Sequence, residues 1–335
     1  MNEQQLADTA KALVAPSKGI LAADESTPSA NKRFAAVGVE QTEENRRRYR
    51  ELLLTTPGAE AHLSGVIFYD ETFWQNTSSG APMREAIAEH GVIPGIKLDL
   101  GLDDLGGFPG EKISRGLDDL ATRAAKYALS GAQFAKWRSV IAIGDGIPTD
   151  ACIEANAFVL ARYARICQDS GLVPIVEPEV LLDGVHTIAD AEAAMTRTFD
   201  ALFAAMAKYR VYLPGAILKT SMVVPGKDSG AAMDHADVAT RTSRVLKEHV
   251  PTELGGVVFL SGGQTSDDAM NNLDAIAKMG PYPWGLTFSY SRALQDPVLK
   301  HWAAHPDDIA GAQERFRDRL EKAALARDGK LGGMA

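Results

Sequence analysis

The feature of this chain that most limits its fold is a series of eight short apolar runs, each ending in or just before a polar residue. The runs are Ile20–Asp24, Val66–Asp70, Gly95–Asp99, Gln133–Arg138, Val173–Glu177, Ala216–Lys219, Gly256–Leu260 and Leu286–Ser289. Runs of this length and composition are typical of strands buried on both faces. Longer stretches with helical periodicity separate them, so we expect a parallel sheet with helical crossovers.

Four of the intervening stretches have clear helical patterns. They are Ala121–Ser130, Ala151–Ser170, Asp190–Tyr209 and Asp237–His249. Glycine follows the first two, at Gly131 and Gly171, as expected where a helix ends. Met1 to Ala15 has the spacing of a short amphipathic helix.

Eight strands alternating with helices predict a TIM (β/α)8 barrel. The 335 residues suit one such domain, 1–335, with a short C-terminal tail from about residue 328. The alternative is an open doubly wound sheet, which favours a glycine-rich phosphate loop after its first strand. Here the first run continues into Ala-Asp-Glu-Ser at 23–26, and no G-x-G-x-x-G occurs.

Charge and composition exclude several classes of partner. The net charge of −9 argues against nucleic-acid binding, which needs an excess of Lys and Arg. No apolar run approaches the roughly 20 residues that span a bilayer, and the N-terminus lacks the pattern of a signal peptide. The two cysteines, Cys152 and Cys167, offer no disulfide framework. We therefore expect a cytoplasmic protein without nucleic-acid or membrane partners.

In a barrel of this type, active sites lie where the strands end. The ends carry Asp24, Asp70, Lys97 with Asp99, Lys136 with Arg138, Glu177 with Glu179, Lys219, Ser261, and Ser289 with Arg292 beyond it. Residues two apart share a face of a strand, so three strands each direct two ionisable groups to one side. Charges that merely solvate the rim are the alternative. That role does not require lysines inside apolar sequence, and so we favour an active site.

Lys219 and Lys136 both lie in apolar sequence. A desolvated lysine with a second cation nearby has a lowered pKa. The neutral amine can then attack a ketone carbonyl and form a Schiff base. A lysine that extends from a strand end to solvent is the alternative for Lys219.

The residues after the last two strands predict a phosphate site. Gly262 and Gly263 allow backbone N–H groups to approach an anion, Ser261 supplies a hydroxyl, and Arg292 can bind phosphate bidentately. Lys97 and Arg138 are candidates for a second phosphate. Five cations at one mouth of an acidic chain indicate an anionic substrate.

A zinc-dependent mechanism is a possible rival, since Zn²⁺ can stabilise an enolate. Zinc usually needs several histidine ligands. None of the seven histidines ends a predicted strand, and none forms an H-E-x-x-H motif. We therefore expect neither a metal nor another cofactor.

Several long motifs resemble class I fructose-bisphosphate aldolase. They are Gly19–Thr27, Thr42–Arg47, Phe134–Arg138, Val159–Arg165, Val173–Glu179, Leu218–Lys219, Phe259–Gln264 and Leu286–Tyr290. The resemblance implies metal-free, reversible cleavage of fructose 1,6-bisphosphate to dihydroxyacetone phosphate and glyceraldehyde 3-phosphate, in glycolysis or gluconeogenesis. It also implies a homo-oligomer, usually a tetramer.

The resemblance carries over to individual residues. It implies Lys219 as the Schiff-base lysine, Glu177 as its acid/base, and Asp24 as the carboxylate that helps C–C cleavage. Lys136 and Glu179 match supporting residues of the catalytic site. The residues that match substrate or phosphate binding are Ser26, Ser29, Arg33, Arg46, Lys97, Arg138, Ser261, Gly262, Gly263, Ser289 and Arg292.

Two departures from the family pattern stand out. Ser291 occupies a position where the family usually has glycine, and the last tyrosine is Tyr290, although many members carry a terminal tyrosine. Two alternative functions remain. One is another Schiff-base barrel, such as a transaldolase-like enzyme or an aldolase for a monophosphate sugar. The other is an aldolase-shaped scaffold without turnover.

Overall fold

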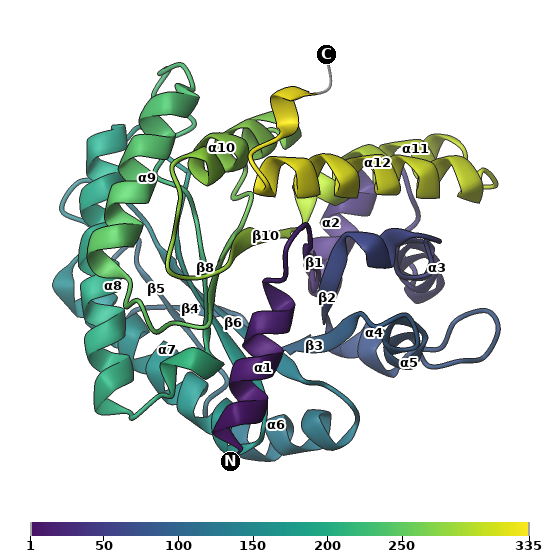
Figure 1. Cartoon of the computed structure of the whole chain (residues 1–335), viewed down its shortest axis with the longest axis horizontal. Helices are drawn as coiled ribbons and strands as arrows, with labels where there is room; N and C mark the ends of the chain where they lie inside the picture. The colour runs from purple at the N-terminus through teal and green to yellow at the C-terminus, as the bar shows by residue number, and fades with distance from the viewer. Residues whose placement is uncertain (1, 334–335) are drawn as a thin grey trace.

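The computed structural model describes residues 2–333, so Met1 and residues 334–335, the end of the predicted tail, lie outside it. Eight parallel strands form a closed barrel in the order β1-β10-β9-β8-β7-β6-β3-β2 (Figure 1). The predicted TIM (β/α)8 barrel is therefore confirmed.

Each of the eight predicted runs overlaps one strand of the barrel. The strands are β1 Gly19–Ala23, β2 Leu63–Phe68, β3 Ile93–Lys97, β6 Phe134–Ile141, β7 Val173–Val180, β8 Ile217–Thr220, β9 Gly256–Phe259 and β10 Leu286–Tyr290. The predicted ends were wrong by more than one residue for four of them. β2 and β3 each start and stop earlier than predicted, with their last residues at Phe68 and Lys97, while β6 and β7 each continue for three residues beyond their predicted ends. An antiparallel hairpin that was not predicted, β4 Leu102–Asp104 with β5 Lys112–Ser114, follows β3.

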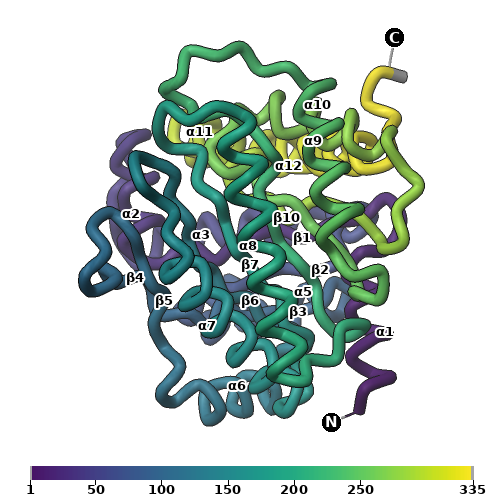
Figure 2. Tube along the Cα trace, turned by 90° about the vertical axis from the view of Figure 1, so that its left-hand side faces the viewer, coloured from purple at the N-terminus to yellow at the C-terminus, as the bar shows by residue number. Residues whose placement is uncertain are grey.

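Helices surround the barrel (Figures 1 and 2). They are α1 Glu3–Leu13, α2 Thr27–Ala36, α3 Glu43–Leu54, α4 Asp70–Trp74, α5 Met83–Ala88, α6 Leu120–Leu129, α7 Asp150–Asp169, α8 Ile188–Lys208, α9 His235–His249, α10 Ser266–Lys278, α11 Arg292–Ala304 and α12 Ile309–Arg327. Short 3-10 helices occupy Ala59–Ala61, Leu213–Gly215 and Leu331–Gly333. The predicted helices correspond to α1, α6, α7, α8 and α9. Among residues 2–333, no helix is long and apolar enough to cross a membrane.

Side-chain caps explain where several helices begin. Thr187 and Asp190 form a capping box at the start of α8, and Thr149 and Thr265 cap α7 and α10. Each cap satisfies backbone N–H groups that have no partner inside the helix. These caps fix the first residue of each helix. Each of these helices begins after a loop, so the residues at the strand ends lie outside the helices and can form a site.

Helix α1 closes the N-terminal end of the barrel. Its residues Leu6, Ala10 and Leu13 pack with Val14 against side chains inside the barrel. Those side chains are Ile20, Ala22, Ile67, Phe134, Val173, Ile175, Ile217 and Val258. Figure 2 shows α1 at the opposite end of the barrel from the β4–β5 hairpin. The apolar plug leaves only the C-terminal end open for polar chemistry.

The barrel interior allows no side chain at Gly95, and this gives a test of its packing. A Cβ at Gly95 would lie 2.3, 2.4 and 2.5 Å from three ring atoms of Phe134. We expect Gly95→Ala to lower the free energy of unfolding by about 1–3 kcal/mol, the usual cost of overpacking, as measured by urea denaturation. Gly106→Ala is the control, since no heavy atom lies within 4 Å of its added Cβ. An unchanged urea midpoint for Gly95→Ala would show that the packing is wrong.

Candidate active site

A cavity of about 440 Å³ opens at the C-terminal ends of the barrel strands. It is lined by Ala22, Asp24, Glu25, Ser26, Ser29, Lys97, Asp99, Gly101, Leu102, Lys136, Arg138, Glu177, Glu179, Lys219, Leu260, Ser261, Gly262, Ser289, Ser291 and Arg292. Every barrel strand except β2 contributes a residue within it or just beyond its end. The cavity therefore lies where the strand-end argument predicts it.

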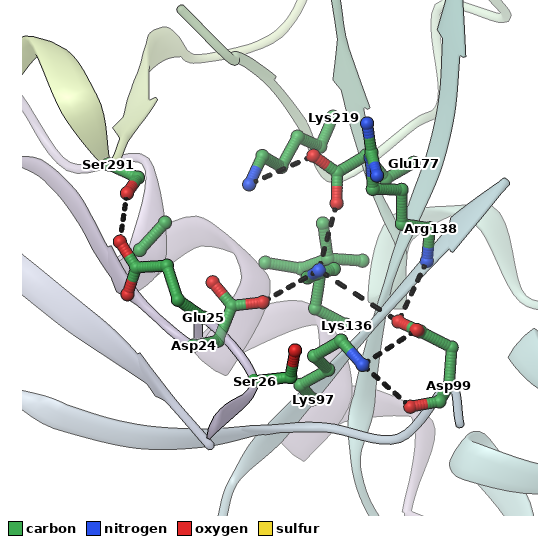
Figure 3. Close-up of polar contacts among 12 residues, drawn as sticks. Asp24, Glu25, Ser26, Lys97, Asp99, Lys136, Arg138, Glu177, Lys219 and Ser291 are labelled. Carbon is green, nitrogen blue, oxygen red and sulfur yellow. Dashed lines mark hydrogen bonds and ion pairs between the residues drawn. The ribbon is translucent and has the colours of Figure 1, made fainter. Parts of the chain in front are cut away.

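Lys136 lies at the centre of this cavity, within contact of three carboxylates. Its Nζ is 2.7 Å from Asp24 Oδ2, 3.2 Å from Glu177 Oε2 and 3.9 Å from Asp99 Oδ2 (Figure 3). Its side chain is only 4% exposed. The barrel register produces this cluster, because β6 lies between β3 and β7 and Lys136 is level with Lys97.

Lys219 has a simpler environment. Its Nζ lies 3.1 Å from Glu177 Oε1, and its side chain is 5% exposed. Glu177 therefore contacts Lys219 through one carboxylate oxygen and Lys136 through the other (Figure 3). This bridging carboxylate can exchange protons with atoms attached to either amine.

Two further ion pairs lie on one side of the cavity. Lys97 Nζ is 2.7 Å from Asp99 Oδ1 and also donates to the backbone oxygen of Asp99 at 2.8 Å. Arg138 pairs with Glu179 through its Nε. Both cations that were predicted to hold a second phosphate are therefore paired within the protein.

The opposite side of the cavity presents hydrogen-bond donors. Gly262 and Gly263 adopt left-handed φ values of 52° and 94°, which turn the chain sharply after Ser261. In the described part of the chain, the buried Ser289 hydroxyl has no hydrogen-bond partner and Arg292 takes part in no ion pair. The arginine is near Gly263, whose added Cβ would lie 3.6 Å from its Nη2. Unpaired donors around a turn are suited to an anion.

The chain matches the family model described as fructose-bisphosphate aldolase class-I over residues 5–335. It is 49% identical over 334 residues to a probable fructose-bisphosphate aldolase class 1 of Xanthomonas campestris, which covers 99% of this chain and 100% of that protein. A crystal structure of Plasmodium falciparum fructose-bisphosphate aldolase superposes with a TM-score of 0.96 at 45% identity, covering 98% of this chain and 95% of the other. The chain belongs to the class I fructose-bisphosphate aldolases. It is therefore a Schiff-base, metal-independent lyase that acts on phosphorylated sugars.

A plant relative has the same family name. The cytosolic fructose-bisphosphate aldolase 4 of Arabidopsis thaliana is 46% identical over 319 residues, or 95% of this chain and 80% of that protein. The resemblance identified from sequence motifs is confirmed. The transaldolase-like and scaffold alternatives are not supported by these matches.

The charges in the aldolase site shift the pKa values of its central groups. Burial alone would raise the pKa of Asp24, but Lys136, Lys219 and Lys97 outweigh burial and lower it to about 2. Burial likewise opposes ionisation of Glu177, yet Lys136, Lys219 and Arg138 lower its pKa. Both carboxylates are therefore ionised near neutral pH.

Lys136 does not behave as its sequence predicts. The expected lowering of its pKa was wrong. Burial disfavours the ammonium, but Asp24, Glu177 and Asp99 raise the pKa above its ordinary value. The apolar sequence around Lys136 revealed its burial, but three carboxylates from other strands decide its charge. Lys136 is therefore a permanent cation in the aldolase site.

The charges that line the cavity balance one another. Its five cations are Lys97, Lys136, Arg138, Lys219 and Arg292, and its five carboxylates are Asp24, Glu25, Asp99, Glu177 and Glu179. The cavity therefore has no formal net charge. Attraction of a phosphate therefore depends on where the charges lie, and above all on Arg292 and the donors around it.

Four predicted residues do not line the cavity. Arg33 pairs with Glu25 and with Asp296 at 2.9 Å. Arg46 forms two bonds to Glu71 at 2.8 and 2.7 Å. Gly263 lies just behind its neighbour Gly262. Asp70 begins α4, where it accepts hydrogen bonds from Trp74 and Tyr127, so it is no strand-end group of the site.

Glu25 and Ser291 line the cavity but were not predicted as site residues. Glu25 directly follows Asp24, and strict alternation would turn it away from the site. However, β1 ends at Ala23, so alternation no longer applies at Glu25. Ser291 precedes Arg292 at the start of α11. Both residues lie just beyond the end of a strand, and that position is the sequence signal that could have identified them as site residues.

Within residues 2–333, no group of three or more His, Cys, Asp or Glu side chains is arranged to hold a metal ion. Both cysteines are buried and free.

The lowered pKa of Asp24 predicts how its contribution to stability depends on pH. A carboxylate whose pKa is about 2 in the folded protein, against an ordinary value of 3.8, stabilises the fold fully above pH 5 and loses this effect as pH falls below 4. We therefore expect the loss of unfolding free energy in Asp24→Asn to be on the order of 2 kcal/mol at pH 6 and smaller at pH 3. Urea denaturation at several pH values measures it. A difference that stays constant from pH 6 to pH 3 would contradict this assignment.

Proposed function

We propose that Lys219 is the nucleophile of this aldolase and that Glu177 moves the protons of Schiff-base formation. The observation that carries the proposal is the 3.1 Å contact between Lys219 Nζ and Glu177 Oε1 at the base of the cavity. A buried amine that touches a single carboxylate can transfer a proton to it and then attack a carbonyl. Lys136, held by three carboxylates, is unsuited to that role because it keeps its proton.

In Schiff-base formation, each proton that leaves Lys219 is taken up by Glu177 or by the oxygen of the substrate. The neutral Lys219 amine attacks C2 of the open-chain sugar, and the proton that the attacking nitrogen loses passes to the carbonyl oxygen to give a carbinolamine. Glu177, protonated by the amine, donates its proton to the departing hydroxyl, which leaves as water. The resulting iminium ion on Lys219 is the electron sink for the next step.

Cleavage of the C3–C4 bond requires removal of the proton from the C4 hydroxyl. We assign this step to Asp24, because it is ionised and lies 2.7 Å from the fixed charge of Lys136. The electron pair of the broken bond moves into the iminium and gives an enamine, while glyceraldehyde 3-phosphate leaves. Protonation of the enamine at C3 and hydrolysis of the imine release dihydroxyacetone phosphate and regenerate Lys219.

The phosphate groups bind at the two ends of the cavity in this proposal. Ser261, Gly262, Ser289 and Arg292 hold one phosphate, with Gly263 shaping the turn. Lys97, Arg138, Ser26 and Ser29 line the path to the second phosphate, and Glu179 orients Arg138 through their ion pair. Arg33 acts from behind the cavity through Glu25, and we assign Arg46 no contact with substrate.

Three wider proposals rest on the family rather than on this geometry. We propose that residues 1–335 act as a single domain with a short tail. We also propose a homo-oligomer, with four subunits as is usual in the family, and a location in the cytoplasm.

Replacing Lys219 with methionine tests the proposal. We expect Lys219→Met to lose cleavage of fructose 1,6-bisphosphate by at least about 10³-fold, since no other group forms the covalent intermediate. It should also lose trapping of dihydroxyacetone phosphate by borohydride, while its circular dichroism spectrum stays that of the wild type. Lys208→Met, at an exposed lysine of α8, is the matched control and should retain both activities. Full cleavage activity in Lys219→Met would overturn the proposal.

A further inference from the structure

Glu25 lies between the catalytic cavity and a small internal space behind it. It lines the cavity together with Ser291, and it also lines a space of about 10 Å³ together with Arg33, Arg50 and Gln295. A space of this size holds about one water molecule. Glu25 is therefore a carboxylate shared by the substrate site and a buried arginine cluster.

Donors on two sides hold the Glu25 carboxylate. From behind, Arg50 Nη2 lies 2.7 Å from Oε2, Arg33 pairs with Oε1, and Gln295 Nε2 donates to Oε1 at 3.2 Å. From the cavity side, the Ser291 hydroxyl donates to Oε1 (Figure 3). Among the described donors to this carboxylate, Ser291 is the one that lines the cavity.

Ser291 occupies the N-cap position of α11, but its side chain makes no capping hydrogen bond. The hydroxyl that would ordinarily cap the helix is directed to Glu25 instead. The next residue, Arg292, forms no ion pair with any described residue and lies on the side assigned to phosphate. The Glu25 carboxylate is thus tied to the same helix end from which Arg292 reaches the substrate.

We propose that Ser291 is a positioning residue of the phosphate subsite, and that its hydroxyl holds the Glu25 carboxylate against the arginines and away from a bound phosphate. The inference deepens the proposed function and rests on its assignment of Arg292 to the phosphate. Like charges repel, so a carboxylate free to turn into this end of the cavity weakens phosphate binding. Arg33 and Arg50 neutralise most of the Glu25 charge, and the lowered pKa of Glu25 agrees with this. Ser291 fixes the orientation of the Glu25 carboxylate and thereby the direction of its remaining negative charge.

The test is a double-mutant cycle in which inorganic phosphate is the competitive inhibitor of fructose 1,6-bisphosphate cleavage. We expect Ser291→Ala to raise the phosphate inhibition constant by about two- to tenfold, the effect of a single hydrogen bond, with kcat within about twofold of the wild type. In the Glu25→Gln background the charge is gone, so the same serine substitution should change the constant less than about twofold.

Two results would overturn the inference. One is an unchanged inhibition constant in Ser291→Ala. The other is an equal rise in both backgrounds, because the hydroxyl would then act on phosphate directly and not through Glu25. If Glu25→Gln does not fold, Ser291→Thr takes its place, since it keeps the hydroxyl. A constant as weak as that of Ser291→Ala then overturns the inference.

Arg292→Met separates this inference from the proposed function. If phosphate inhibits Arg292→Met as strongly as the wild type, the assignment of the phosphate subsite itself fails. If Arg292→Met loses inhibition while Ser291→Ala does not, only the role of Ser291 fails.

Discussion

The site depends on one buried ammonium group, that of Lys136, and on the three carboxylates around it. Removing such a charge from water costs several kcal/mol unless partners replace its hydration. Asp24, Asp99 and Glu177 do so, and each comes from a different strand of the barrel or its end. The cluster therefore forms only if the barrel closes in its observed register. In return, it keeps Asp24 and Glu177 ionised in a cavity where burial alone would protonate them.

The same cluster divides the work between two lysines that look alike in sequence. Lys136 has several anionic partners and remains charged, whereas Lys219 forms an ion pair with one carboxylate of the described residues, that of Glu177. Glu177 bridges the two, so the carboxylate that takes a proton from Lys219 also contacts a fixed cation, whose attraction lowers the pKa of Glu177 and favours release of that proton in the next step. Farther out, Glu25 follows the same principle, because Arg33 and Arg50 neutralise it from behind the cavity. The catalytic mouth is thus a set of paired charges with few unpaired donors, among them Arg292.

The barrel and most of the site could be predicted from sequence because both depend on local patterns. An apolar run that ends in Lys219 or in Glu177 predicts a strand, and it also predicts that the side chain of its last residue lies at the C-terminal end of the barrel. The position of Arg33 could not be predicted in this way, because it depends on how α2 packs beside Glu25 and α11. The pKa of Lys136 was wrongly predicted for a similar reason, since its partners are far apart in the chain. Asp70 was misplaced because β2 ends at Phe68 and α4 begins at Asp70 itself, so its carboxylate accepts hydrogen bonds from Trp74 and Tyr127 and does not line the cavity.

Mass spectrometry of the wild-type protein tests the central claim most directly. The protein is reduced with borohydride in the presence of dihydroxyacetone phosphate, digested, and its modified peptide is sequenced. Lys219 and Lys136 lie in different peptides, so the position of the added three-carbon phosphate identifies the nucleophile. The division of roles between the two lysines predicts that the adduct is on Lys219 and that Lys136 is unmodified. An adduct on Lys136 would contradict it.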